Sequence, residues 1–208
     1  MRLADLRFID VLAAFRSPNP TPGGGSASAM SGAIGASLLA MVGGLPKPRT
    51  QGPEDEKRLE AVRERCAAIS DRLAALMDRD SEAYDSVVAA FRLPKGSDEE
   101  KRVRTGRIQE ALRAATETPL DVMRACVEAI RAAADVAALG NGNASSDVRV
   151  GLELLMAGVR GAALNVAINL KSIKDQAYVK AAATEAEELE WAAALDRNTA
   201  IESLPEPG

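Results

Sequence analysis

Apolar residues recur every three or four positions between residues 54 and 91, and charged residues fill most of the positions between them. This spacing predicts one amphipathic helix, which at ~1.5 Å per residue extends about 55 Å. A buried stripe on so long a helix requires a bundle or a second subunit to cover it. The apolar positions are Leu59, Val62, Cys66, Ile69, Leu73, Leu76, Ala83, Val87 and Ala90.

A second helix is predicted over residues 26–45, where charged residues are absent up to Pro46 and small residues recur every four positions. Small side chains at Ser28, Gly32, Ala36 and Ala40 allow another backbone to approach closely. The stretch is nearly long enough to span a membrane but is rich in Gly and Ser, so we expect it to be buried inside protein.

The remaining pattern predicts further helices and no strand. Ser97 and Glu100 have the spacing of a capping box, and Thr118-Pro119 is typical of an N-cap followed by a first helical residue. We therefore expect separate helices over residues 3–15, 98–117, 119–139, 147–170 and 175–195. The predicted fold is an all-α, single-domain helical bundle with one very long amphipathic helix, covering residues 1–203, with a frayed tail at 204–208.

Composition narrows the possible chemistry. Apolar residues make up 47% and aromatic residues 3%, which favours close-packed helices over strands. The chain contains no histidine, so a Ser-His-Asp triad, an HExxH zinc site and histidine-bound haem are excluded. Cys66 and Cys126 lie far apart among apolar positions, so we expect buried thiols in a reducing compartment and no metal site.

The charge balance indicates which partners are expected. Lys and Arg number 26 against 30 Asp and Glu, a net charge of -4 that offers no field for a nucleic acid backbone. The first ten residues are interrupted by charges and do not resemble a targeting signal. We expect a cytoplasmic protein that binds neither nucleic acid nor membrane.

Asp80 is the one carboxylate on the apolar stripe of the long helix. Burying an unpaired charge costs several kcal/mol, so Asp80 must be partnered, protonated or exposed in a cleft. In a dry cleft, burial raises the pKa of a carboxyl group toward the range useful for acid–base catalysis. The plainer alternative is that the stripe leaves the core here and Asp80 meets solvent. Ser81 is its neighbour, and Tyr84 lies one turn further on nearly the same face.

The segment PTPGGGS, residues 20–26, places three glycines immediately before a predicted helix. Composition alone favours a flexible linker. The alternative is a binding loop in which bare backbone amides and the helix dipole meet an anionic or carbonyl group.

Five other polar positions have both a structural and a functional interpretation. Asp147 follows Ser146 at a predicted helix start, where the helix dipole stabilises an acidic side chain by ~0.3–1 kcal/mol. The same helix start keeps the carboxylate ionised, so Asp147 could also serve as the counter-charge of a cationic ligand. Asn141 follows Gly140, as is common in turns. Lys95 occupies a tight turn. Asn165 and Asn169, one turn apart on an apolar helix, form either a hydrogen-bonded core pair or a pair of ligand-binding amides.

Six stretches occur in an order that resembles the cyclodeaminase/cyclohydrolase family of folate enzymes, related to the C-terminal domain of formiminotransferase-cyclodeaminase. The stretches are PTPGGGSASA (20–29), DSEAY (80–84), LPK (93–95), IQEAL (108–112), GN with SD (140–141 and 146–147) and NVAINL (165–170). One family element, Thr-x-Gly-Lys, is replaced here by LPKPRT at residues 45–50, which leaves Lys47 and Arg49 as candidate cations for the folate tail.

The resemblance implies an all-α homodimer that acts on a one-carbon unit bridging two nitrogens of tetrahydrofolate, with the folate as substrate and no further cofactor. Cyclohydrolysis interconverts 5,10-methenyltetrahydrofolate and 10-formyltetrahydrofolate, and cyclodeamination converts 5-formiminotetrahydrofolate to the methenyl form with loss of ammonia. No formiminotransferase segment accompanies the sequence, which favours the cyclohydrolase.

On this interpretation Asp147 stays ionised beside the cationic substrate, Asp80 or a water that it holds handles the proton, and Lys95 meets negative charge. A reading from a different class is a helical dimerisation module, in which Asp80 fixes the register. The residues expected to bind substrate are Gly23, Gly24, Gly25, Ser26, Ser81, Tyr84, Asn141, Ser146, Asn165 and Asn169.

Overall fold

The computed structural model describes residues 2–205, and within that range it is helical with no strand. The predicted all-α bundle is therefore confirmed. Its helices are η1 (Leu3–Asp5), α1 (Phe8–Arg16), α2 (Gly24–Gly43), α3 (Pro53–Phe91), α4 (Asp98–Leu139), η2 (Gly142–Ala144), α5 (Ser145–Leu170) and α6 (Gln176–Glu202).

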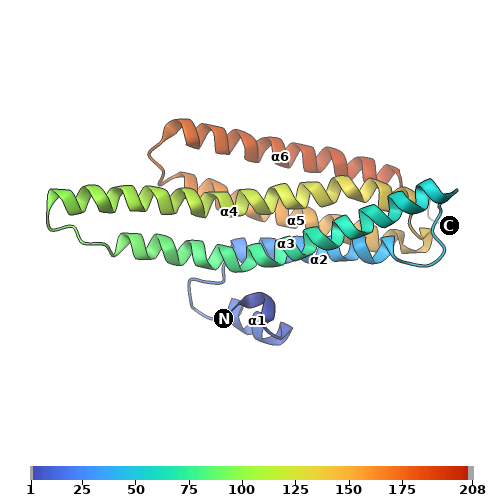
Figure 1. Cartoon of the computed structure of the whole chain (residues 1–208), viewed down its shortest axis with the longest axis horizontal. Coiled ribbons are helices and arrows are strands. Elements are labelled where there is room, and N and C mark those ends of the chain that lie inside the picture. Colours follow the sequence, from blue (N-terminus) through green and yellow to red (C-terminus); the bar gives the residue numbers. More distant parts are fainter. Residues whose placement is uncertain (1, 206–208) are drawn as a thin grey trace.

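Four helices form the body of the molecule. The long helices α3 and α4 run side by side, α2 and α5 lie behind them, α6 lies along the outer edge of α4, and α1 projects from the opposite edge (Figure 1). Helix α2 has 20 residues, about half the 39 of α3 and the 42 of α4. The other three body helices therefore continue past the start of α2, and the space beside that start is not filled by a fourth helix.

The predicted long helix and its apolar stripe are confirmed. Helix α3 begins at Pro53 and ends at Phe91, and its stripe from Leu59 to Leu76 is buried. The stripe is only partly buried at Asp80, Ala83 and Val87, where α2 no longer covers it, and it is buried again at Ala90. The capping box that begins α4 is also present, with Ser97 and Glu100 bonded to each other's backbone N–H groups.

Helices α2 and α5 pack antiparallel at very short range. A Cβ placed on Gly35 would lie 2.6 Å from the Gly151 carbonyl oxygen, so only glycine fits there. Both helices are long and apolar enough to cross a membrane, but 50% and 44% of their most apolar windows are buried in this bundle. The expectation that the segment over residues 26–45 packs against protein is thus confirmed.

Both cysteines lie in the core. A Cβ on Gly32 would lie 2.5 Å from Cys126 Sγ, so this thiol fills the space that the glycine leaves. Burial raises the pKa of Cys66 and of Cys126 to about 12, which keeps both as neutral thiols.

The predicted helix break at Thr118-Pro119 is wrong, because α4 continues through both residues. Thr118 does not cap a helix start: its Oγ1 donates to the Ala114 carbonyl over 3.3 Å. Pro119 has no N–H for the Ala115 carbonyl, four residues earlier. That carbonyl instead accepts a hydrogen bond of 2.9 Å from Asn169 Nδ2 on α5, so a neighbouring helix satisfies the group that the proline leaves free.

Three other predicted boundaries change. The helix expected over residues 3–15 is divided into η1 and α1, with extended backbone at Leu6 and Arg7. The last helix runs to Glu202 rather than to residue 195. Within the predicted tail Leu204 packs against the core, while residues 206–208 lie outside the described residues.

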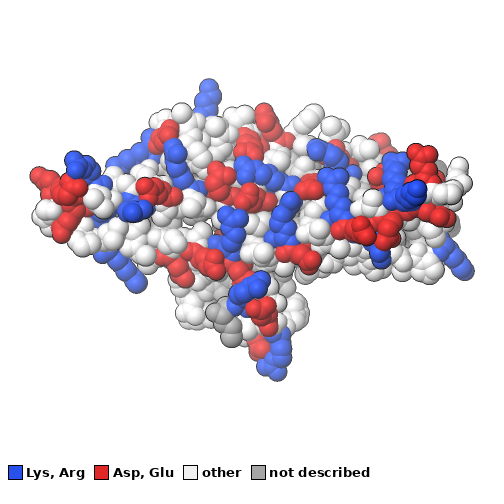
Figure 2. Space-filling view, viewed as in Figure 1, with Lys and Arg blue, Asp and Glu red and all other residues white. Residues whose placement is uncertain are grey.

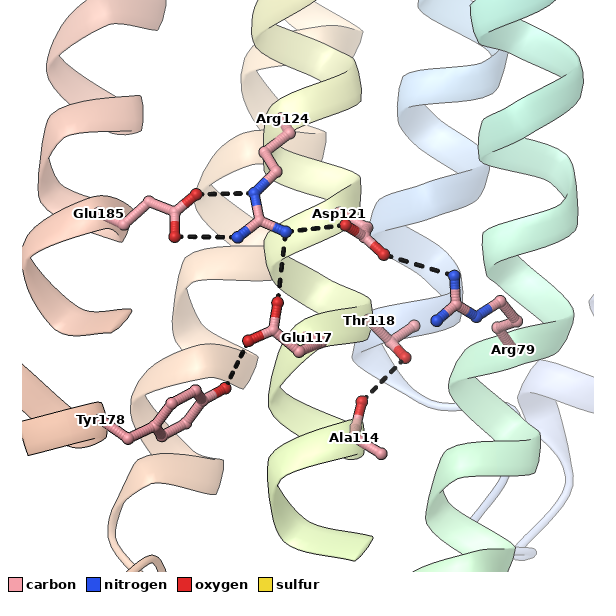
Figure 3. Close-up of polar contacts among 8 residues, drawn as sticks. All are labelled: Arg79, Ala114, Glu117, Thr118, Asp121, Arg124, Tyr178 and Glu185. Carbon is pink, nitrogen blue, oxygen red and sulfur yellow. Dashed lines mark hydrogen bonds and ion pairs between the residues drawn. The ribbon is translucent and has the colours of Figure 1, made fainter. Parts of the chain in front are cut away.

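Ion pairs tie the outer faces of the helices together. On the side where α3, α4 and α6 are in front, basic and acidic residues are interspersed without a patch of one sign (Figure 2). Arg124 on α4 pairs with Glu185 on α6 and with Asp121 and Glu117 on its own helix (Figure 3). The second carboxylate oxygen of Asp121, Oδ2, accepts a hydrogen bond of 3.3 Å from Arg79 Nη1 of α3. This network fixes α4 against its neighbours at the level of Pro119.

Candidate active site

A cavity of about 300 Å³ occupies the space beside the start of α2. Helices α3, α4 and α5 form its walls, and the segment that leads into α2 closes one side. The residues that line it are Pro20, Thr21, Gly23, Gly24, Gly25, Asp80, Ala83, Tyr84, Val87, Leu112, Ala115, Asn165 and Asn169.

Asp80 provides the carboxylate of this cavity. Its Oδ2 accepts a hydrogen bond from the Ser26 backbone N–H over 2.8 Å and lies 2.9 Å from Ser26 Oγ. Ser26 is the third residue of α2, and the N-cap residue Gly23 has no side chain to satisfy that N–H. Asp80 therefore caps α2 from the neighbouring helix α3, as an N-cap side chain would do within one helix.

The glycine segment allows this contact. A Cβ on Gly25 would lie 2.1 Å from Asp80 Oδ1, whereas a Cβ on Gly23 would lie no closer than 3.6 Å to any neighbour. The favoured interpretation of a flexible linker is wrong, because Gly24 and Gly25 form the first turn of α2. The carboxylate lies directly against the bare backbone at Gly25.

Burial raises the pKa of Asp80 above its ordinary value, and the side-chain and backbone hydrogen bonds from Ser26 only partly offset this. Ser26 has one hydroxyl hydrogen and two acceptors within reach, Asp80 Oδ2 and the Met77 carbonyl at 3.0 Å. The hydroxyl can thus donate to the ionised carboxylate or turn to Met77 when the carboxyl group is protonated. The group is able to take up and release a proton without leaving its place.

The rest of the cavity combines an apolar panel with two amides. Tyr84, Val87, Leu112 and Ala115 supply flat and aliphatic surface from α3 and α4. Asn165 and Asn169 come from the last two turns of α5. This is the arrangement expected of a small-molecule site, in which a few polar groups orient a ligand against apolar walls.

Seven of the predicted site residues line this cavity: Gly23, Gly24, Gly25, Asp80, Tyr84, Asn165 and Asn169. Ser26 lies beneath it, fully buried, and contacts Asp80. Four segments distant in sequence therefore meet at this cavity. Sequence reasoning did not select the other lining residues, although Val87 belongs to the apolar stripe and Leu112 to the stretch IQEAL. These residues are Pro20, Thr21, Ala83, Val87, Leu112 and Ala115.

Two predicted residues near the cavity do not line it. Lys95 lies in the turn after α3, which continues for eleven residues, about 16 Å at ~1.5 Å per residue, beyond Asp80. Ser81 points away from the cavity, because successive helical residues diverge, and it lines an adjacent depression with Asp78, Glu82 and Asp85.

Asn141, Ser146 and Asp147 lie at the opposite end of the bundle. Asp147 is in the first turn of α5 and Asn165 is eighteen residues later, about 27 Å along the helix at ~1.5 Å per residue. Asn141 is engaged in turn contacts: its Nδ2 donates to the Pro46 carbonyl over 2.7 Å and its Oδ1 accepts from the Asn143 N–H. Asp147 and Asp80 of one chain do not share a cavity.

Arg49, a candidate cation for the folate tail, is also occupied at this far end. Its backbone N–H donates to the Leu139 carbonyl over 2.7 Å and its Nε to the Gly140 carbonyl over 3.1 Å. The guanidinium thus caps the C-terminus of α4. Within residues 2–205, no group of three or more Cys, Asp or Glu side chains is arranged to hold a metal ion.

Comparison with known proteins places this geometry in a family. The family model described as formiminotransferase-cyclodeaminase matches residues 7–188. The chain belongs to this family. It is 43% identical over 182 residues to a methenyltetrahydrofolate cyclohydrolase of Methylorubrum extorquens, an alignment that covers 88% of this chain and 86% of that protein.

Two further relatives widen the comparison. A formimidoyltransferase-cyclodeaminase of Rattus norvegicus is 36% identical over 157 residues, and this chain spans only 29% of its length. A solved structure of formiminotetrahydrofolate cyclodeaminase from Thermotoga maritima has a TM-score of 0.85 and 28% identity, with 98% of each chain covered. The family resemblance drawn from the six sequence stretches is confirmed, and the helical architecture is shared along the full chain.

Proposed function

We propose that the chain is a methenyltetrahydrofolate cyclohydrolase, which interconverts 5,10-methenyltetrahydrofolate and 10-formyltetrahydrofolate with water. The observation that carries this proposal is the Asp80 carboxylate, placed in a small cavity with a raised pKa, in a chain of this family. The 43% identity to a protein named for that activity favours the cyclohydrolase among the family's reactions.

The cavity suits the pterin part of the substrate. A volume of about 300 Å³ accepts a bicyclic ring but not a whole folate, so the aminobenzoyl-glutamate tail extends outside. Tyr84, Val87 and Leu112 offer the ring an apolar surface, and the polar groups Asp80, Asn165 and Asn169 lie around it. A carboxylate is the appropriate charge, because the methenyl group is part of an amidinium cation.

The reaction requires only a positioned water and a group that moves its proton. Water attacks the bridging carbon, and the ionised Asp80 accepts one proton as the carbon–oxygen bond forms. The bond from this carbon to N5 then breaks, its electron pair goes to N5, and Asp80 returns the proton there. The remaining hydroxyl proton leaves as the formyl C=O forms, so one water is consumed and one proton is released.

The proposal assigns roles to the other predicted catalytic residues by their locations. Asp147 stabilises the start of α5 through the helix dipole and contributes to catalysis only if it comes from a second copy of the chain. Lys95 is exposed in the turn after α3, too far from Asp80 to act on the ring. It can therefore meet only the tail of the substrate. Ser81 and Asn141 have no part in binding the ring.

A single assay tests the function. Purified protein is mixed with 5,10-methenyltetrahydrofolate, and loss of its near-ultraviolet absorbance is followed against the uncatalysed rate. We expect acceleration that depends on enzyme concentration, whereas an unchanged rate would refute the cyclohydrolase. Inactivity toward 5-formiminotetrahydrofolate as well would favour a helical dimerisation module.

The cyclodeaminase is the second candidate, because the solved structure with a TM-score of 0.85 carries that name. The same Asp80 would then protonate the departing ammonia. Release of ammonia from 5-formiminotetrahydrofolate, faster than turnover of the methenyl substrate, would select this reaction instead.

We also propose that the chain works as a cytoplasmic homodimer through exposed apolar residues of α2 and α5. Ile34 is 43% exposed, Leu164 72% and Ile168 63%, and α2 has no charged residue to oppose burial. Light scattering should give twice the monomer mass, and Leu164→Glu should shift it to the monomer. A monomeric wild type, or flotation with lipid vesicles instead, would contradict the proposal.

A further inference from the structure

Two backbone carbonyls determine how the amides of the cavity are oriented. Asn165 Nδ2 donates to the Gly161 carbonyl of its own helix over 2.8 Å, and Asn169 Nδ2 donates to the Ala115 carbonyl of α4 over 2.9 Å. In both residues one of the two amide N–H groups is engaged in this way, which fixes the orientation of the amide. The amide oxygens accept no hydrogen bond from the described residues, so with the Asp80 carboxylate they offer acceptors to a ligand in the cavity.

The Asn169 contact depends on Pro119. In a regular helix the Ala115 carbonyl would accept the backbone N–H of residue 119, but proline has none. The preceding carbonyl, that of Ala114, also accepts a hydrogen bond from Thr118 within the same helix (Figure 3). The Ala115 carbonyl is thus the one in this turn that accepts a hydrogen bond from α5, and Ala115 lines the cavity.

The surrounding helices hold this turn of α4 in place. Arg124 binds Glu185 of α6 through two hydrogen bonds of 2.6 and 2.9 Å, and Tyr178 of α6 donates to Glu117 over 2.7 Å. Since the network brackets Pro119 from both sides along the helix, a change at this one residue alters the Ala115 carbonyl without displacing α4.

We propose that Pro119 is a positioning residue for substrate binding: it keeps the Ala115 carbonyl free, and this carbonyl holds the Asn169 amide with its oxygen toward the ligand. The kind of ligand rests on the proposed function. A reduced pterin carries several N–H donors, and an amide oxygen held in one place accepts from one of them, whereas a freely rotating amide would present its NH2 group at that place part of the time.

Pro119→Ala tests this inference, because it should weaken substrate binding without lowering the stability of the protein. Alanine restores the backbone N–H and favours the helix, so the melting temperature should not fall. The Ala115 carbonyl then bonds within α4, and Asn169 loses its anchor. We expect KM for the folate to rise about 3- to 10-fold, the equivalent of one ordinary hydrogen bond, with kcat changed less than about twofold.

The matched control is Gly106→Ala on the same helix. A Cβ at Gly106 meets nothing within 4 Å, so this variant also favours the helix without touching the cavity. It should leave KM unchanged. An equal rise of KM in both variants would attribute the effect to the stiffness of α4 and overturn the proposal.

A double-mutant cycle separates this inference from the proposed function. Asn169→Ala alone should raise KM, and adding Pro119→Ala should raise it no further; multiplied effects would refute the positioning role. The same cycle on thermal stability, measured without ligand, should also be non-additive, and strict additivity would refute the contact. If the wild type converts neither folate while this stability coupling is present, only the proposed function fails.

Discussion

At one end of α5, Asp147 lies in the first helical turn, beside turns whose polar groups bond to one another. At the other end, Asn165 and Asn169 face the cavity that contains Asp80. Both carboxylates lie beside the N-terminus of a helix. Asp147 belongs to the helix that it stabilises, whereas Asp80 belongs to α3, contacts the start of α2 and lines the cavity. Proximity to a helix start thus stabilises the ionised form of an acid, whereas burial beside a cavity makes a carboxyl group useful for proton transfer.

The largest effect should come from Asp80→Asn. Asparagine keeps an oxygen that can accept from the Ser26 N–H, so α2 remains capped, but it cannot accept a proton. We expect kcat to fall about 10²- to 10⁴-fold, the usual contribution of a general acid–base group, measured by the methenyl absorbance assay. Asp85→Asn, an exposed change on the same helix, is the control and should keep kcat.

Gly25→Ala should have the next largest effect. Its Cβ would overlap Asp80 Oδ1 and push the carboxylate out of place. We expect kcat/KM to fall about 100-fold, as for a catalytic group displaced by roughly 1 Å. Gly106→Ala, outside the cavity and with nothing within 4 Å of its methyl group, should remain within about threefold of wild type. Equal activity in the two variants would mean that the position of Asp80 does not matter.

Asp147→Asn should have a small effect on turnover. The change removes a charge that favours the start of α5 and should cost ~0.3–1 kcal/mol of stability, read from urea denaturation. We expect kcat to stay within about threefold of wild type, the range of a purely structural change. A loss as large as that of Asp80→Asn would contradict this separation of the two ends. Recovery of activity on mixing the two inactive variants would then assign Asp147 to the site of a second copy.

The smallest effect should be the pH dependence of stability. Burial raises the pKa of Asp80 in the folded state, so the folded protein binds more protons than the unfolded chain between the two pKa values. The contribution of Asp80 to stability therefore falls as the pH rises through this interval and stays low above it. Asp80→Asn, compared with wild type by denaturation at several pH values, should be relatively more stable above the interval than below it. The opposite slope would show a carboxylate that prefers its ionised form.

Much of the fold was predictable because it depends on regular spacing. The stripe from Leu59 to Leu76 and the capping box at Ser97 are local patterns with one structural solution. Pro119 was misinterpreted because a local rule was applied where a distant residue, Asn169, supplies the missing hydrogen bond. An unbroken apolar spacing from Ile108 through Leu112 to Met123 was the available signal that the helix continues.

The candidate site was predictable only in part, for a related reason. The polarity of Asp80 on an apolar stripe marked it from sequence alone. Its contact with Gly25, however, joins residues far apart in the chain, and composition favoured a linker there. Resemblance to a family identified the motif that contains Asp147, but the end of the bundle at which it lies depends on the lengths and directions of α2 and α5.

The pH profile of kcat/KM for 5,10-methenyltetrahydrofolate hydrolysis tests the central claim most directly. If the buried Asp80 carboxylate is the proton acceptor, the rate should rise with pH through one ionisation above the ordinary range of an aspartate, near ~3.9, and this step should vanish in Asp80→Asn. A step that persists unchanged in that variant would contradict the account.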